Sequence, residues 1–360
     1  MRVHNFYAGP ATLPQRVLED ASSELVNYQG LGLSIMETSH RSKEYEQVHN
    51  QAIERLTNLL SLGDEFDVVL LGGGATLQFA MVPMNLLKPD VSCDIVVSGS
   101  WAKKAKADAQ TVGNVTVTWD GKDQGYTTLP DPASVKAKPG SAYMHITSNE
   151  TIQGLQWNDF PDLGDTPLVC DMSSDILSRP LPLDRFDLIY AGAQKNLGPA
   201  GVTVVIIRRT LLDRMNANLP AYLAYRTHVE KNSLYNTPPV YAVYMLNKVL
   251  GWVEEKGGLT AMESRAAEKA DLLYEEIDNS DGFYHCPVDR TNRSRMNVVF
   301  RLPDEELESR FIEEAAEEGM IGLKGHRSVG GIRASLYNSL SPQAVEDLTA
   351  FMHRFAAEHR

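Results

Sequence analysis

Lys195 lies in a part of the sequence where a solvent-exposed lysine is not expected. Lys195 lies in the segment 187–201, which reads Asp-Leu-Ile-Tyr-Ala-Gly-Ala-Gln-Lys-Asn-Leu-Gly-Pro-Ala-Gly, between apolar runs at 188–190 and 202–207. Two apolar runs separated by small residues, glycine and proline predict two buried strands joined by a tight loop. The amine could then point into a cavity and do chemistry there, or it could reach water along its aliphatic stem.

A carboxylate follows another predicted strand. Asp171 comes directly after the apolar residues 168–170, so its side chain is expected to face the core. A buried carboxylate is costly unless it is paired or hydrogen-bonded, so Asp171 requires a positive partner. The alternatives are a helix cap or an ion pair with Arg179 or Arg185.

Three glycines, 72–74, join a predicted strand at 67–71 to a helix that runs through Leu87. Bare backbone N–H groups and the start of a helix together make a cradle for a phosphate. Neither nucleotide-binding fingerprint fits, because Leu77 occupies the last glycine position of Gly-x-Gly-x-x-Gly and no Gly-Lys-Ser/Thr follows. A tight strand-to-helix turn would require the same glycines.

Strands and helices alternate between about residues 67 and 207, which predicts an α/β fold with a mostly parallel sheet. Further predicted strands at 94–97, 114–119 and 142–146 place Trp101 and Thr151 just beyond strand ends. Because ligands bind at the carboxyl edge of such sheets, we expect Gly74, Trp101, Thr151, Asp171 and Lys195 to share one cleft. Trp101 could stack on a planar ring there or simply pack.

The remaining elements predict a second, smaller domain. Helices are expected at 15–28, up to about Leu62, at 238–252 and at 259–277. The last hundred residues read strand 297–302, acidic helix 304–319, strand 331–336 and helix 342–359. We interpret residues 15–260 as a large domain, and residues 1–14 with 261–360 as a small α+β domain. The glutamates of the acidic helix are expected to form a solvated face.

Two cationic clusters interrupt an acidic chain whose formal net charge is −13. His40 and Arg41 follow a glycine-rich loop, and the segment 324–333 gathers a lysine, a histidine and two arginines. Such a local reversal of charge indicates an anionic substrate. For the first cluster, a surface pair at the start of a helix remains the alternative.

The composition excludes several other classes. The net charge argues against a general nucleic-acid surface. Three distant cysteines without a Cys-x-x-Cys pattern indicate no metal site and favour the reducing cytoplasm. The first residues contain no apolar leader and no apolar run approaches the roughly 18 residues of a membrane span, so we expect neither export nor membrane insertion.

The constellation as a whole matches the needs of pyridoxal 5′-phosphate (PLP). The aldehyde requires an amine, the protonated pyridine nitrogen a carboxylate, the phosphate a helix start and the ring an aromatic face. Each feature is weak by itself, but the ordered set is specific.

The sequence resembles the phosphoserine aminotransferases, a family among the fold-type I, aspartate-aminotransferase-like PLP enzymes. The resemblance covers essentially the whole chain. The motifs that carry it are Asn5-Phe-Tyr-Ala-Gly-Pro-Ala, Glu37-Thr-Ser-His-Arg-Ser, Gly72-Gly-Gly-Ala-Thr-Leu-Gln-Phe, Gly99-Ser-Trp, Ser148-Asn-Glu-Thr-Ile-Gln-Gly, Asp171-Met-Ser-Ser-Asp-Ile-Leu-Ser-Arg, Gln194-Lys-Asn-Leu-Gly, Asn236-Thr-Pro-Pro and Gly325-His-Arg-Ser-Val-Gly-Gly-Ile-Arg.

The resemblance implies how the cofactor is held. Lys195 would bond covalently to its aldehyde, Asp171 would pair with the pyridinium nitrogen, Trp101 would stack on the ring and Thr151 would touch its hydroxyl side. The phosphate would be held by Ala75, Thr76 and Gln194, together with Asn236 and Thr237 from the other subunit of a homodimer. The resemblance therefore implies active sites shared between two chains.

The resemblance also implies the substrate contacts. Arg333 would clamp the α-carboxylate, because a guanidinium binds a carboxylate bidentately. The distal anion would meet a patch made of His40, Arg41, His326 and Arg327. Some family members carry an arginine in the glycine-rich loop, where this chain has Ala75-Thr76-Leu77. Which side chain contacts the distal phosphate is therefore left open.

The implied reaction moves an amino group between glutamate and 3-phosphohydroxypyruvate, giving O-phosphoserine and 2-oxoglutarate. The related keto acid of vitamin B6 synthesis, 3-hydroxy-2-oxo-4-phosphooxybutanoate, is a second candidate substrate. The alternatives are a serine–glyoxylate-type transaminase, a cysteine desulfurase and a PLP-binding regulatory protein without turnover. A desulfurase needs a mobile nucleophilic cysteine, and none of the three cysteines lies in a glycine-rich loop.

Overall fold

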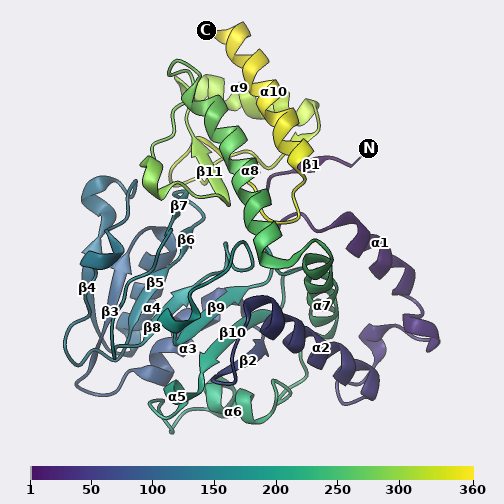
Figure 1. Cartoon of the computed structure of the whole chain (residues 1–360), viewed down its shortest axis with the longest axis vertical. Coiled ribbons are helices and arrows are strands. Elements are labelled where there is room, and N and C mark those ends of the chain that lie inside the picture. The colour runs from purple at the N-terminus through teal and green to yellow at the C-terminus, as the bar shows by residue number, and fades with distance from the viewer. Residues whose placement is uncertain (1) are drawn as a thin grey trace.

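A seven-stranded sheet is the centre of the fold in this computed structural model, which describes residues 2–360 (Figure 1). Its strand order is β2-β10-β9-β8-β5-β3-β4. β10 runs antiparallel to both neighbours, and the other adjacent strands pair in parallel, so the predicted mostly parallel sheet is confirmed. The strands are β2 (Phe66–Leu71), β3 (Ser92–Val97), β4 (Asn114–Asp120), β5 (Met144–Thr147), β8 (Leu168–Asp171), β9 (Leu188–Gly192) and β10 (Thr203–Arg208).

Both faces of the sheet are covered, and this explains the unbroken apolar runs of its strands. In β10, Val204 and Ile206 pack into one core cluster, whereas Val205 and Ile207 pack into another. Successive side chains of a strand point to opposite faces, so the two clusters lie on opposite sides. One face meets α3 (Gly74–Leu86) and α4 (Ser100–Val112), and the other meets α2 (Lys43–Leu60) and α7 (Val240–Glu255).

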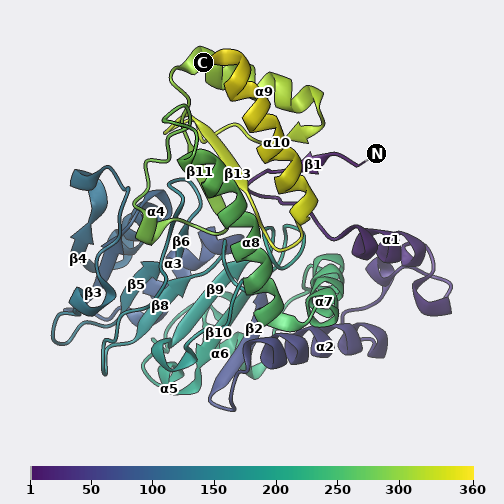
Figure 2. The ribbon, with the colours of Figure 1, turned by 45° about the horizontal axis from the view of Figure 1, so that its top comes forward.

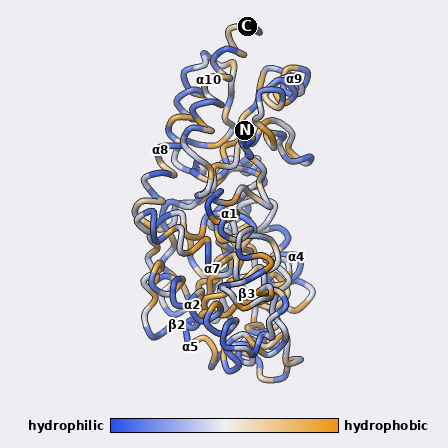
Figure 3. The backbone as a smooth tube through the Cα atoms, turned by 90° about the vertical axis from the view of Figure 1, so that its right-hand side faces the viewer, coloured by the Kyte–Doolittle hydropathy of each residue, from blue (hydrophilic) through white to orange (hydrophobic). Residues whose placement is uncertain are grey.

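A smaller region stands beyond the carboxyl edge of the sheet (Figures 1 and 2). It contains the antiparallel pair of β11 (Asn297–Phe300) and β13 (Ile332–Ser335), together with α9 (Glu305–Glu317) and α10 (Pro342–His359). The long α8 (Gly258–Asp278) leads into this region from the sheet and packs along α10. In Figure 3, hydrophobic and hydrophilic stretches alternate along α9 and α10, as expected for helices with one buried face.

The first residues of the chain return to the C-terminal region. β1 (His4–Asn5) pairs in parallel with β12 (Met320–Ile321), so the two segments lie side by side although they are far apart in the sequence. Shorter helices complete the fold: α1 (Gln15–Glu24), α5 (Arg209–Leu212) and α6 (Tyr225–Glu230). Within residues 2–360, no helix combines the length and the apolar character needed to cross a membrane.

The structure corrects two sequence-based expectations. The first helix ends at Glu24 rather than Tyr28, because Asn27 leaves the helical conformation and its side chain accepts the backbone N–H of Gly32 at 2.7 Å. The acidic helix is not solvated throughout, because the side chain of Glu308 is buried against Arg301. The other predicted helices and strands agree with the structure within a few residues at each end.

Candidate active site

The carboxyl ends of the parallel strands open into a cavity of about 280 Å³. All five residues expected at this edge line it, which confirms the predicted convergence. The expected site residues on the cavity wall are Ala75, Thr76, Trp101, Thr151, Asp171, Gln194, Lys195, His326 and Arg333.

Lys195 lies on the turn of the β9–β10 hairpin and is 8% exposed. Its Nζ donates a hydrogen bond of 2.8 Å to Thr151 Oγ1 and lies 5.6 Å from the centroid of the Trp101 ring. The alternative of a lysine reaching water is therefore wrong.

Backbone and side-chain contacts fix the turn that carries Lys195. Ala193 N–H donates to Val202 O at 3.0 Å, closing the hairpin. The neighbouring Asn196 donates from its amide to Ile176 O at 2.9 Å and accepts the backbone N–H of Asn338 at 3.0 Å. The lysine is thus anchored on both the sheet and the C-terminal region.

Burial lowers the pKa of Lys195 from its ordinary value of 10.5 to about 8, a shift that the nearby Asp171 opposes and Arg333 reinforces. A larger fraction of the amine is therefore neutral near physiological pH than in a solvated lysine. A neutral amine is the form that attacks carbonyl carbon and accepts protons.

The reactivity of this amine should follow its ionisation. In cofactor-free protein, reductive methylation of Lys195 by formaldehyde should accelerate as pH rises and level off above a midpoint near pH 8, because only the neutral amine reacts. Peptide mass spectrometry across a pH series measures the midpoint. Asp171→Asn should move it lower, since the carboxylate raises this pKa; a midpoint that moves higher contradicts the assignment.

Asp171 ends β8 and is 4% exposed. Its Oδ1 accepts hydrogen bonds from Ser173 N–H at 2.9 Å and Ser173 Oγ at 2.6 Å. No residue between 2 and 360 donates a hydrogen bond to Oδ2, and Arg179 and Arg185 contact other groups, so the ion-pair alternative is wrong. Burial raises the pKa of Asp171, while the Ser173 hydrogen bonds and Lys195 lower it.

Trp101 is held by a buried carboxylate that the sequence did not single out. Glu150 accepts the backbone N–H groups of Trp101 at 3.0 Å and Ala102 at 2.9 Å, at the start of α4. A Cβ on Gly99 would lie 2.6 Å from the carboxyl carbon of Glu150, so glycine allows this approach. Burial raises the pKa of Glu150 to about 7. Glu150 binds the backbone of Trp101, and the next residue, Thr151, accepts the hydrogen bond from Lys195, so one short segment contacts both residues.

The start of α3 also lines the cavity. Gly73 and Gly74 have positive φ values of 89° and 65°, which lets β2 turn directly into the helix. The first N–H groups of a helix have no partner within the helix, so those beside Ala75 and Thr76 can bind an anion at the cavity.

Arg333 and His326 of the C-terminal region also line the cavity. Arg333, on β13, donates to Thr151 O at 3.5 Å, and its buried Nε has no hydrogen-bond partner within the described chain. His326 lies in the loop before β13, and its Nδ1 is 2.7 Å from Ser328 Oγ. Burial lowers the pKa of His326, and the charges of Arg333 and Arg327 add to the shift.

The N-terminal arm contributes residues that sequence reasoning missed. Ala8 and Gly9 line the cavity, and a Cβ on Gly9 would lie 3.5 Å from Lys195 Cγ. These residues lie in the motif Asn5-Phe-Tyr-Ala-Gly-Pro-Ala, to which the sequence assigned no role in the site. Ser173 was also missed, along with Thr147, whose buried hydroxyl lacks a partner among residues 2–360.

The remaining expected site residues lie away from this cavity. Asn236, Thr237, Arg41 and Arg327 are exposed, and His40 is half-buried on the loop before α2. Ser42 caps α2, and within residues 2–360 the side chains of His40 and Arg41 make no hydrogen bond or ion pair, which does not favour the capping alternative.

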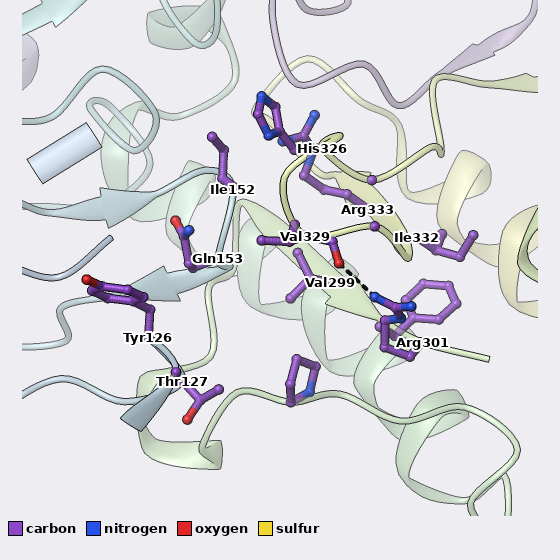
Figure 4. Close-up of a pocket in the computed structure, with 15 residues that line it drawn as sticks. Tyr126, Thr127, Ile152, Gln153, Val299, Arg301, His326, Val329, Ile332 and Arg333 are labelled. Carbon is purple, nitrogen blue, oxygen red and sulfur yellow. Dashed lines mark hydrogen bonds between the residues drawn. The ribbon is translucent and has the colours of Figure 1, made fainter. Parts of the chain in front are cut away.

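A second cavity of about 230 Å³ adjoins the first and shares Ile152, His326 and Arg333 with it (Figure 4). Tyr126 and Gln153 of the sheet region stand on one side, and Arg301 of the C-terminal region stands on the other. This cavity therefore opens between the two regions, beside the cationic loop.

The first cavity fits PLP. Lys195 offers a partly neutral amine, Asp171 an oxygen without a hydrogen bond, Trp101 an aromatic face and α3 free N–H groups. The unpartnered hydroxyl of Thr147 provides a further polar group for a ligand. No cluster of three or more histidine, cysteine or acidic residues in the described part of the chain could hold a metal ion.

Comparison with known proteins gives one consistent result. The family model "Aminotransferase class-V" matches residues 3–348. The phosphoserine aminotransferase of Geobacillus kaustophilus is 55% identical over 356 residues, covering 98% of each chain. The solved phosphoserine aminotransferase of Bacillus circulans subsp. alkalophilus has a TM-score of 0.98 and 50% identity, covering 100% of this chain and 99% of its own.

A more distant solved structure contains the bound cofactor. It is a PLP-bound phosphoserine aminotransferase from Trichomonas vaginalis, 37% identical with a TM-score of 0.89, covering 98% of this chain and 100% of its own. The motifs, the cavity and these full-length matches agree. The chain therefore belongs to the aminotransferase class-V family and, within it, to the phosphoserine aminotransferases.

Proposed function

We propose that this chain catalyses the reversible, PLP-dependent transfer of an amino group between glutamate and 3-phosphohydroxypyruvate, a step of serine biosynthesis. The products are O-phosphoserine and 2-oxoglutarate. Full-length relatedness to phosphoserine aminotransferases supports the substrates. The observation that carries the chemistry is the buried Lys195 amine, held on Thr151 beside Trp101 in the same cavity as Asp171.

Lys195 acts as covalent anchor and proton carrier in this proposal. When bound, PLP supplies a conjugated pyridine ring that accepts the electron pair left on the substrate Cα. Lys195 Nζ would hold the cofactor aldehyde, and as a free amine it would take up the proton from the substrate Cα. A pKa of about 8 suits this work, because a general base is most effective when its pKa lies near the operating pH.

Asp171 and Trp101 would orient and polarise the ring. Asp171 Oδ2 has room to keep a proton on the pyridine nitrogen, while Oδ1 stays anchored on Ser173. Trp101 would cover one ring face. Ala75, Thr76 and Gln194, which line the cavity, would bind the phosphate.

Arg333 would bind the substrate α-carboxylate. Its guanidinium lines the cavity and its Nε has no protein partner in residues 2–360, so a bidentate carboxylate can satisfy it. The distal phosphate or γ-carboxylate would meet His326 and Arg327, together with His40 and Arg41. Arginine guanidinium groups bind both phosphate and carboxylate oxygens, so one patch can accept either anion.

We propose a homodimer in which each active site takes residues from both chains. Asn236, Thr237, His40 and Arg41 lie outside the cavity of their own chain, which supports a role across an interface. A stretch of exposed apolar side chains on α1 and the loop after it offers a surface for the second chain. These are Leu18, Leu25, Val26, Leu31, Leu33 and Met36.

Mixed dimers test the shared site. Lys195→Ala and Arg41→Ala should each be nearly inactive as pure proteins. Coexpressed, they should regain activity, because every mixed dimer contains one site with both residues intact. Purification by two different affinity tags isolates the mixed species. If Arg41 serves its own chain instead, the mixed dimer stays as inactive as the parents.

We further propose residues 15–260 and residues 1–14 with 261–360 as the two domains. The pairing of β1 with β12 supports placing the N-terminal arm with the small domain. We also propose a cytoplasmic location, which the three buried cysteines without disulfides support.

The decisive experiment compares substrates. Purified holoenzyme should convert O-phosphoserine and 2-oxoglutarate to glutamate, whereas L-serine with glyoxylate should give little product. A preference for the serine–glyoxylate pair would overturn the proposal, and absence of any half-reaction with glutamate would favour a binding protein. The same assay with phosphohydroxythreonine decides whether the vitamin B6 substrate is also used.

A further inference from the structure

We propose that Arg301 and Glu308 form a clamp that holds the cationic loop 324–331 where its side chains meet the distal anion of the substrate. Both are positioning residues, and their effect is on discrimination between anionic and neutral side chains of the substrate. The proposal rests on the function proposed above, because it assumes that the loop faces that anion.

Arg301 follows β11 and grips the loop from one side. Its Nε lies 2.6 Å from Glu308 Oε1, and its Nη1 donates to Val329 O at 2.7 Å (Figure 4). The guanidinium therefore joins a carboxylate on α9 to the backbone at the tip of the loop.

Glu308 holds the same loop from the other side. Only 6% of this residue is exposed, and its Oε2 accepts the backbone N–H of Gly331 at 3.1 Å. One ion pair thus binds a carbonyl and an N–H that are two residues apart in the loop. Charge-assisted hydrogen bonds of this kind are stronger than neutral ones.

The glycines of the loop make this contact possible. Gly330 and Gly331 have positive φ values of 71° and 72°. A Cβ on Gly331 would lie 2.7 Å from Arg301 Cδ, and one on Gly330 would lie 3.0 Å from Arg301 Nη1. Glycine is therefore required both for the turn and for the approach of the backbone to the arginine.

The clamp acts on one part of the substrate site. His326 and Arg327 belong to the clamped loop, whereas Arg333 is held independently in β13 by pairing with Val299 of β11. Arg301 itself is neutralised by Glu308, so it is a poor anion receptor although it lines the second cavity. Loss of the clamp should therefore weaken binding of the distal anion by the loop and leave the contact of Arg333 with the α-carboxylate in place.

The test uses holoenzyme variants Arg301→Met, which keeps the aliphatic stem, and Glu308→Ala. The matched control is Arg310→Met on α9, the helix that carries Glu308. This change removes an exposed ion pair with Glu314 whose N–O distance, 2.6 Å, equals that between Arg301 and Glu308. We expect KM for O-phosphoserine to rise about tenfold in both clamp variants, with kcat nearly unchanged, because charge-assisted contacts are lost from binding. The half-reaction with L-alanine, which has no distal anion, should keep its kcat/KM, and the control should match wild type.

A second readout follows the loop itself. Trypsin should cleave after the exposed Arg327 several times faster in the clamp variants than in the control, as measured by peptide mass spectrometry. Glu308→Gln keeps an acceptor for Gly331 N–H and should lie between wild type and Glu308→Ala in both readouts.

The possible results distinguish a failure of the clamp proposal from a failure of the proposed function. An unchanged KM for O-phosphoserine, or an equal loss with L-alanine, overturns the clamp as a determinant of specificity. If wild-type enzyme fails to use O-phosphoserine, the proposed function fails instead. The clamp is then judged by tryptic cleavage and by competition of inorganic phosphate with 2-oxoglutarate, and unchanged values in both would refute it.

Discussion

Replacement of Lys195 with alanine should abolish transamination, lowering kcat by about 10⁴-fold or more, because the variant lacks both the covalent anchor and the base. The loss should be specific to chemistry. The contacts proposed for the cofactor phosphate come from α3 and Gln194, which this change leaves intact. The measurement is a single-turnover reaction with glutamate, followed by the change in cofactor absorbance.

Two comparisons make this result interpretable. The variant should retain bound PLP without a covalent link, and a small primary amine added to it should restore part of the proton transfer in the vacated space. Thr151→Val removes the hydroxyl that accepts from Nζ but keeps the lysine, so it should reduce the rate far less. Undiminished transamination by Lys195→Ala would refute the central assignment.

The convergence of the cavity residues could be predicted because each follows a strand that its own apolar run reveals. Asp171 is the last residue of β8, and Lys195 and Trp101 lie in the first residues beyond β9 and β3. Parallel strands bring such positions to one edge without any knowledge of side-chain contacts. Local pattern and one rule of topology were therefore sufficient to predict that Trp101, Asp171 and Lys195 converge.

Other features of the site could not be predicted, because the contacts that create them leave no pattern in the local sequence. Gly9 reaches Lys195 because the two-residue strand β1 pairs with β12, and a two-residue strand has no periodicity to read. Glu308 looks like any other glutamate of an acidic helix, and only the position of Arg301 in space explains its burial. The resemblance, and no pattern within the chain itself, implied that Asn236 and Thr237 act from a second subunit, and both lie outside the cavity of their own chain.

The residues proposed for the chemical step and those proposed for substrate choice come from different parts of the fold. In the proposed function, chemistry at Cα is assigned to Lys195 and Asp171, which lie at the ends of the adjacent strands β9 and β8. Substrate choice is assigned in the same proposal to loop 324–331, which belongs to the C-terminal region and is contacted by Arg301 and Glu308. Substitutions in the loop or its clamp can therefore change which anion is preferred while the proton transfer is retained.

Asp171→Asn should lower the rate of the glutamate half-reaction by about 10²- to 10³-fold, as expected when one preorganised electrostatic contact is removed. The amide can still accept from Ser173 through its oxygen, so the fold and the position of the side chain should be preserved. It carries no negative charge, however, and cannot keep the pyridine nitrogen protonated. Stopped-flow absorbance measures the rate.

The control and the rescue identify charge as the cause. Ser173→Ala removes one hydrogen bond to Oδ1 and leaves the carboxylate, so it should cost about tenfold or less. A cofactor analogue methylated on the pyridine nitrogen carries a fixed positive charge and should return much of the lost activity to Asp171→Asn. If the analogue restores nothing, Asp171 does not act through the charge of the ring nitrogen, and its role would be to hold Ser173 and the end of β9, where Gly192 N–H donates to Ser173 Oγ at 3.1 Å.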